Sequence, residues 1–265
     1  MMQNVSILGC GWLGLPLAKK MVAGTIVVKG STTSENKLEI LRKEGITPFH
    51  ISLQENEVEG NITQFLAGSD ILIIDVPPKA KSGEDFAQKI KTLIPHIDAS
   101  GIAKVLFVSS TSVYADDNSV VTEETIPNPD TESGRQLVET EKLLQGNSNF
   151  KTTILRFGGL IGEDRHPVKH LAGRENLANP DGPVNLIHRD DCIGIVMKII
   201  EREAWGETFN AAFPDHPTRE AYYTNKAVEA GLPLPKFAKE GSSHGKVIDS
   251  VKIRELLGFT FAAGI

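Results

Sequence analysis

Apolar runs of three to six residues alternate with longer amphipathic stretches through the first 156 residues. The runs occupy 5–8, 26–28, 49–53, 71–76, 105–108 and 153–155. They are apolar throughout rather than at every second position, which is typical of strands covered by helices on both faces. Helical periodicity fills the intervals at 13–22, 34–43, 83–98 and 131–145. This alternation predicts a parallel sheet whose strands are joined by crossover helices.

The pattern changes after residue 156. Glycines and prolines divide the chain into loops, with helical stretches near 190–202, 218–230 and 250–257. We predict a principal domain of residues 1–156 and a small lobe of residues 157–265. Segments of about 185–213 are expected to return to the main sheet.

A glycine-rich turn follows the first apolar run directly and precedes a helix. Gly9 would permit a tight turn, Gly11 would let the backbone approach a pyrophosphate, and Gly14 would let the helix pack on the sheet. The alternative is a purely structural turn. We predict a dinucleotide site that also includes Trp12 and Leu13, in an α/β fold with a Rossmann-type doubly wound parallel sheet.

The segment after the second strand suggests which dinucleotide fits. An NAD-specific site places an acid there, but this chain has Lys29-Gly30-Ser31-Thr32-Thr33. Hydroxyl and amide donors with a charge from Lys29 or Lys37 would suit a 2′-phosphate, so we predict NADP in preference to NAD; alternatively, this segment is only a turn. Other strand ends supply further cofactor candidates, namely Val76, Pro77, Ser109, Phe157 and Gly158.

The amino-acid composition limits the kinds of molecule that this protein is expected to bind. The 265 residues are 40% hydrophobic and 23% charged, with a formal charge of −6, which gives no footprint for nucleic acid or for an anionic membrane. Cys10 and Cys192 lie far apart, so neither a disulfide framework nor a metal site is expected. We expect no signal peptide, no membrane span and a cytoplasmic location.

The fifth strand runs into Val108-Ser109-Ser110-Thr111-Ser112-Val113-Tyr114. With the glycine turn, this motif resembles the extended short-chain dehydrogenase/reductase family, the group of NAD-dependent epimerases and dehydratases. Further family-like marks are Arg156, 185–191, Phe209-Asn210 and 255–259. The resemblance covers nearly the whole chain and implies that Ser110 bonds the substrate oxygen.

The family's catalytic Tyr and Lys are missing. Alignment on Gly134 and Glu141 places Ser133 and Leu137 at their positions, and no tyrosine lies between 115 and 221. Tyr222 and Lys226 have the family spacing, but on a helix of the outer lobe. The chain is similar to the atypical YeeZ-type group, which also lacks the pair. Ser110, Ser112 and Ser133 are therefore the catalytic candidates.

Basic residues gather in the glycine-rich region beyond 156. We predict Tyr114, His166, Lys169 and Arg174 as substrate-binding residues, for a small anionic molecule such as a phosphate or a nucleotide-linked sugar; a solvated loop is the alternative. Two hypotheses stay open: an oxidoreductase or epimerase-like enzyme, and a silent NADP(H)-binding sensor. A homodimer is an assembly that the sequence allows.

Overall fold

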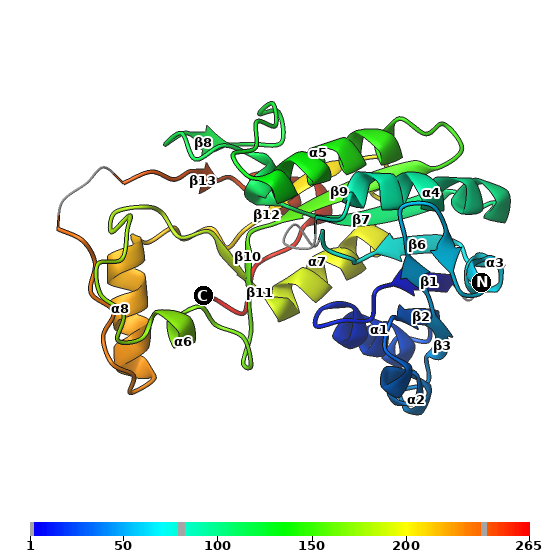
Figure 1. The fold of residues 1–265 in the computed structure, drawn as a ribbon, viewed down its shortest axis with the longest axis horizontal. Helices are drawn as coiled ribbons and strands as arrows, with labels where there is room; N and C mark the ends of the chain where they lie inside the picture. The colour runs from blue at the N-terminus through cyan, green and yellow to red at the C-terminus, as the bar shows by residue number, and fades with distance from the viewer. Residues whose placement is uncertain (1–2, 79–82, 240–242) are drawn as a thin grey trace.

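The computed structural model describes residues 3–78, 83–239 and 243–265 and is built around one parallel sheet (Figure 1). Its strand order is β12-β9-β7-β6-β1-β2-β3. The strands are β1 (Asn4–Leu8), β2 (Val27–Thr32), β3 (Thr47–His50), β6 (Ile71–Ile74), β7 (Lys104–Ser110), β9 (Lys151–Phe157) and β12 (Thr208–Ala211). The order runs outward from β1 in both directions, which confirms the predicted doubly wound sheet.

Helices cover both faces of this sheet. One face carries α1 (Gly14–Ala23), α2 (Glu35–Lys43), α7 (Arg189–Glu201) and α9 (Val251–Leu257), whose apolar side chains share a core with β1. The opposite core includes α3 (Ile62–Leu66), α4 (Phe86–Ser100) and α5 (Glu132–Gln145). Burial on both sides explains why the strands are apolar throughout.

The third strand differs from the prediction. The apolar run predicted residues 49–53, but β3 begins at Thr47 and ends at His50, and Ser52–Leu53 form a separate short strand, β4. Pairing with β2 aligns Thr47 with Lys29. Because β3 is the edge strand of the sheet, Pro48 is tolerated within it, and its low strand propensity misplaced the predicted boundary.

Several short elements, together with the longer helix α8 that the sequence predicted near 218–230, complete the described chain. They are β5 (Val58–Glu59), η2 (Thr111–Val113), β8 (Val120–Val121), β10 (Gly159–Ile161), α6 (Val168–Leu171), β11 (Leu186–His188), α8 (Arg219–Glu229) and β13 (Val247–Ile248). Some of these strands pair across long sequence separations, as β8 does with β13. Elements of two to five residues carry too few positions for periodicity to reveal them.

Residues beyond 156 contribute to both parts of the molecule. β12 joins the main sheet beside β9, and α7 packs against the β1 side of the core. A separate apolar cluster joins α6 and α8, at the left of Figure 1. In the described residues, none of the helices combines the length and apolar character needed to cross a membrane.

Candidate functional site

The three glycines of the β1–α1 turn meet different surroundings. Gly9 has φ +107°, and a Cβ there would lie 2.3 Å from the Asp75 carbonyl oxygen. A Cβ on Gly14 would lie 2.2 Å from the Gly9 oxygen, whereas one on Gly11 would meet nothing within 4 Å. Gly9 and Gly14 therefore serve the packing of the turn, while Gly11 leaves open space at the surface for a ligand.

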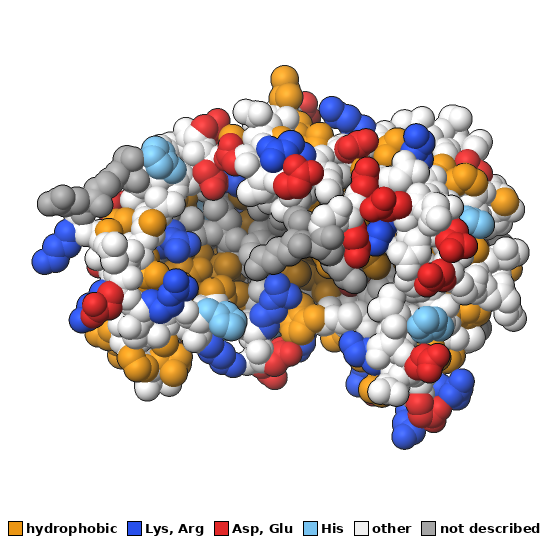
Figure 2. Space-filling view, in the orientation of Figure 1, with side chains coloured by type: hydrophobic (Ala, Val, Ile, Leu, Met, Phe, Trp, Pro, Cys, Tyr) orange, Lys and Arg blue, Asp and Glu red, His pale blue; other side chains and the backbone are white. Residues whose placement is uncertain are grey.

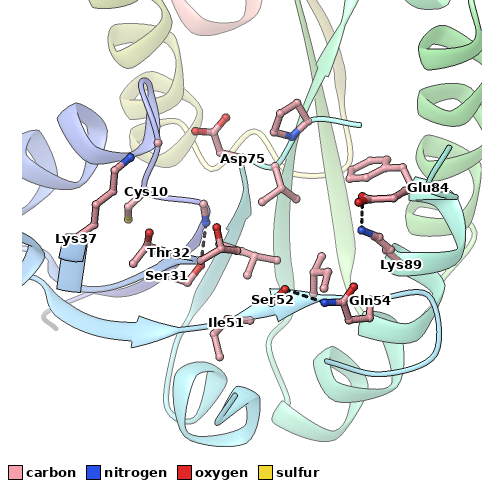
Figure 3. Close-up of a pocket in the computed structure, with 18 residues that line it drawn as sticks. Cys10, Ser31, Thr32, Lys37, Ile51, Ser52, Gln54, Asp75, Glu84 and Lys89 are labelled. Atoms are coloured by element: carbon pink, nitrogen blue, oxygen red, sulfur yellow. Dashed lines mark hydrogen bonds and ion pairs between the residues drawn. The ribbon is translucent and has the colours of Figure 1, made fainter. Parts of the chain in front are cut away.

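A first cavity of about 320 Å³ opens beside this turn, at the carboxyl ends of β1 and β2 (Figure 3). The turn contributes Gly9 and Gly11, and β2 with the following loop contributes Ser31, Thr32 and Thr33. The Ser31 hydroxyl accepts the Gly9 N–H at 3.0 Å, which ties the two segments together. The opposite wall carries the Lys89–Glu84 ion pair.

The two lysines considered for a 2′-phosphate lie in different places. Lys29 donates to the Gln64 and Ala67 carbonyls at the end of α3, at 2.9 and 2.6 Å. It does not line the first cavity, but Lys37 does, as Figure 3 shows. The structure therefore offers Lys37 as the cation on the α2 side of this cavity.

A second cavity of about 500 Å³ continues from the first, with which it shares Gly11, Asp75, Val76 and Pro77. Most other predicted cofactor residues line it, namely Trp12, Leu13, Ser109, Phe157 and Gly158. Ser110, Leu137 and Arg165 also face it. The predicted residues thus lie together along the carboxyl edge of the sheet, where open α/β folds bind ligands.

Polar residues on three neighbouring strands support this edge from below. Ser109, Arg156 and Asn210 are aligned in register across β7, β9 and β12. Glu141 of α5 accepts a 2.6 Å hydrogen bond from Ser109 and pairs with Arg156 at 2.5 Å, with both charged side chains buried. The network therefore fixes the Ser109 hydroxyl beneath the strand end.

Tyr114 belongs to the same network. Its hydroxyl donates to Asn210 at 2.9 Å and accepts from Arg156 at 2.5 Å. The side chain is buried, and burial raises the Tyr114 pKa. It lines none of the cavities described here, so the geometry gives Tyr114 a supporting position rather than direct contact with a substrate.

A third cavity of about 320 Å³ adjoins the second and shares Ser110, Gly158 and Gly159 with it. Its wall includes Ser112 together with Asn185, Arg219, Tyr223 and Lys246, which the sequence prediction did not select. The Arg219 Nε is buried without a partner among the described residues. Figure 2 shows a hollow between the α6–α8 lobe and the sheet, with Lys and Arg side chains at its border.

The predicted basic cluster lies elsewhere. His166 Nε2 is 2.9 Å from the Tyr222 hydroxyl, and its Nδ1 accepts the Val168 N–H, which assigns the ring proton to Nε2. Lys169 and Arg174 are exposed and line none of the cavities described here. Tyr222 is buried in the cluster that joins α6 and α8, so the Tyr222–Lys226 spacing falls outside the cavities.

Comparison with known proteins agrees with the sequence prediction of a dinucleotide-binding protein. A family model described as NAD(P)H-binding matches residues 9–202. The chain belongs to this NAD(P)H-binding family. It is also 36% identical over 266 residues to Protein YeeZ of Escherichia coli strain K12, covering 98% of this chain and 96% of that protein, which confirms the resemblance to the YeeZ-type group.

Solved structures share the fold of this NAD(P)H-binding protein. A functionally unknown conserved protein of Silicibacter pomeroyi has a TM-score of 0.81 at 23% identity, covering 98% of this chain and 94% of that one. MoeE5, solved in complex with UDP-glucose and NAD, has a TM-score of 0.82 at 17% identity, covering 99% and 94%. Identities this low establish the architecture alone.

The residues that the sequence aligned with the family's Tyr–Lys pair, Ser133 and Leu137, lie in different surroundings. Leu137, which the sequence prediction aligned with the Lys, lines the second cavity, and the described lining of that cavity contains neither tyrosine nor lysine. Ser133 lines none of the cavities described here, and its hydroxyl lies 3.4 Å from that of Thr131. In the described residues, no cluster of His, Cys, Asp and Glu is arranged to hold a metal ion.

Among the described lining residues, Asp75 is the one carboxylate shared by the first and second cavities. It is half-buried and follows β6, beside the beginning of α1, where it accepts a hydrogen bond from the Gly14 N–H, and desolvation raises its pKa to about 7. The folded protein therefore keeps a proton that the unfolded chain, with a carboxyl pKa near 3.8, releases. This preferential protonation stabilises the folded protein below about pH 4. That part of the free energy of unfolding is lost as the pH rises from about 4 to 7.

We expect Asp75→Asn to remove this pH dependence of the free energy of unfolding. The amide oxygen can still accept the Gly14 N–H, but the side chain carries no charge above pH 7. At pH 8 the variant should be more stable than the original protein by roughly 2–4 kcal/mol, with little difference at pH 4. Urea unfolding across this range measures it, and a difference independent of pH would contradict the burial argument.

Proposed function

We propose that this protein binds NADP(H) along the carboxyl edge of its sheet and acts as an oxidoreductase or epimerase-like enzyme on a small anionic molecule. The observation that carries the proposal is the continuity of the three cavities. Gly11 and Asp75 join the first to the second, and Ser110 with Gly158 joins the second to the third. Adenosine, nicotinamide and substrate would occupy them in that order.

The preference for NADP(H) rests on the α2 side of the first cavity. Thr32, Thr33 and Lys37 line it, and no carboxylate stands among residues 29–33. Among the described residues, no acidic side chain forms an ion pair with Lys37, whose charge is therefore available to a 2′-phosphate. An NAD-specific site would instead place an acid near the ribose.

Removing this cation should separate the two cofactors. We expect Lys37→Ala to weaken NADPH binding about tenfold and to leave NADH binding unchanged, since one charge-assisted contact is lost. Lys43→Ala on the same helix is the matched control, because Lys43 is exposed and lines none of the described cavities. Calorimetric titration gives both affinities; tighter binding of NADH than of NADPH by the original protein would refute the preference.

The nicotinamide, when bound, supplies hydride transfer, and the chain's own residues would position the substrate. We assign Ser110 to hold the reacting oxygen, since it lines both the second and third cavities. Ser112 is next to it, while Ser133 would need to move to contribute. Arg219, whose Nε has no partner among the described residues, favours an anionic substrate, whereas Lys246 is already paired with Asp116 at 2.7 Å. The UDP-glucose complex of MoeE5 supports a nucleotide sugar.

A sensor of the NADP(H) pool is the second candidate. Leu137 faces the second cavity where a lysine would lower the pKa of a catalytic tyrosine, so the usual proton transfer has no acid there. Turnover decides between the two. Steady NADPH consumption or epimerisation with UDP-glucose and related anionic sugars would support the enzyme, whereas tight NADPH binding with no turnover across that panel would favour the sensor.

A further inference from the structure

A short turn from the second half of the chain lies directly on the glycine-rich turn of the first. Gly162 and Arg165 exchange backbone hydrogen bonds of 2.8 and 3.1 Å, which closes the turn between them. A Cβ on Gly162 would lie only 2.9 Å from the ring of Trp12. Glycine at 162 therefore lets this turn rest against the tryptophan that follows Gly11.

The contact holds two arginines on one ring. The Trp12 indole N–H donates to both Asp164 carboxylate oxygens at 3.0 Å. The guanidinium carbons of Arg165 and Arg189 lie 5.0 and 4.9 Å from the Trp12 ring centroid, within the range of cation–π attraction. The tryptophan thus holds both side chains against the beginning of α1.

The two arginines differ in what neutralises them and where they face. Arg189 lies 3.3 Å from an Asp164 oxygen, so its charge is compensated. In the described part of the chain, no carboxylate lies within ion-pair distance of Arg165. Arg165 lines the second cavity together with Gly11 and Asp75, and Arg189 does not. An uncompensated guanidinium therefore faces the region where the first and second cavities meet.

We propose that Arg165, held on the ring of Trp12, binds the diphosphate of the dinucleotide where it crosses from the first cavity to the second. This inference rests on the proposed function. The crossing point is the shared set Gly11, Asp75, Val76 and Pro77. A guanidinium can donate two parallel hydrogen bonds to phosphate oxygens.

Asp75 explains why a cation is required at this point. Its carboxyl group takes the Gly14 N–H, one of the donors that the beginning of a helix usually offers to a phosphate. Where Asp75 is ionised, above its pKa of about 7, its carboxylate would also repel a diphosphate. Arg165 supplies both the donors and the compensating charge, from a segment about 150 residues away along the chain.

The indole of Trp12 can report ligand binding at the second cavity. The chain has two tryptophans, so Trp205→Phe leaves Trp12 as the sole indole reporter at the cavity. In that background we expect Arg165→Ala to weaken NADPH binding about 10- to 100-fold, as loss of a charge-assisted contact predicts. Binding of adenosine 2′-monophosphate, which lacks the diphosphate, should stay unchanged. Arg165→Lys should restore part of the affinity, and Arg189→Ala should stay within about threefold of the background.

Ionic strength supplies a readout that a merely structural role would not move. The NADPH affinity of Arg165→Ala should fall less steeply with salt than that of the background protein, because a cation–phosphate contact is absent. Equal NADPH affinity in both would overturn this proposal while leaving the proposed function intact. Equal weakening of NADPH and adenosine 2′-monophosphate would also overturn it, and a background protein that fails to bind NADPH would overturn both proposals.

Discussion

Glu141→Leu should lower the free energy of unfolding by about 3–5 kcal/mol, the cost of leaving one partner of a buried ion pair uncompensated. The change removes the carboxylate that accepts from Ser109 and pairs with Arg156, both of which are buried. Arg156 then retains only the Tyr114 hydroxyl as a side-chain partner among the described residues. Chemical denaturation measures the loss, which corresponds to a fall in Tm of about 10 °C.

The same helix offers a matched control. Glu139 lies two residues earlier on α5 and is exposed, so Glu139→Leu should change stability by less than about 0.5 kcal/mol. The double variant Glu141→Leu/Arg156→Leu should recover part of the loss, because it leaves no stranded guanidinium. If Glu141→Leu unfolded at the same denaturant concentration as Glu139→Leu, the network would not be the support that its geometry indicates.

The second large effect separates two glycines three residues apart. Gly14→Ala should destabilise the protein by about 3 kcal/mol or more, because its Cβ would lie 2.2 Å from a backbone oxygen that cannot rotate away. Gly11→Ala should leave the free energy of unfolding within about 0.5 kcal/mol of the original, since its Cβ meets no atom within 4 Å. The added methyl group should nevertheless weaken dinucleotide binding at least tenfold.

Denaturation and NADPH titration of both variants make the comparison. Each glycine is tested against the other, since they share one turn and one motif. The expected pattern is a stable Gly11→Ala protein that binds poorly and an unstable Gly14→Ala protein. Normal NADPH binding by Gly11→Ala would show that the space beside Gly11 is not where the diphosphate lies.

Several particular residues show how far the sequence could predict the site. The sequence could predict four lining residues because each lies at the end of a recognisable apolar strand: Ser31, Thr32, Thr33 and Ser110. Such strand ends meet at one edge of a parallel sheet. Lys29 satisfied the same rule but points to the end of α3 instead. Its side chain donates hydrogen bonds to carbonyl groups some 35 residues further along the chain. The sequence around Lys29 contains no sign of that contact.

The basic residues show where sequence clustering and cavity lining differ. His166, Lys169 and Arg174 were predicted from a basic cluster along the chain to which Arg165 also belongs, but of these four only Arg165 lines a described cavity. Arg219 and Lys246 stand outside that cluster and line the third cavity. Clustering in sequence was a poor guide there, because loops of the outer lobe place neighbouring residues on different surfaces. Asn185 lies in the family-like segment 185–191, and this resemblance was the available signal for it.

The sequence by itself determined the doubly wound sheet, the glycine turn and the family of this protein. The sheet and the turn depend on apolar periodicity, on φ at single glycines and on strand-to-helix order, and the family was indicated by the resemblance of short motifs. All of these are local along the chain. Only the tertiary structure decided that Lys37 rather than Lys29 faces the first cavity, that Tyr114 supports the sheet edge, and that Arg165 lies on Trp12. Each of those positions depends on atoms contributed by distant segments, whose contacts exist only once the chain has folded.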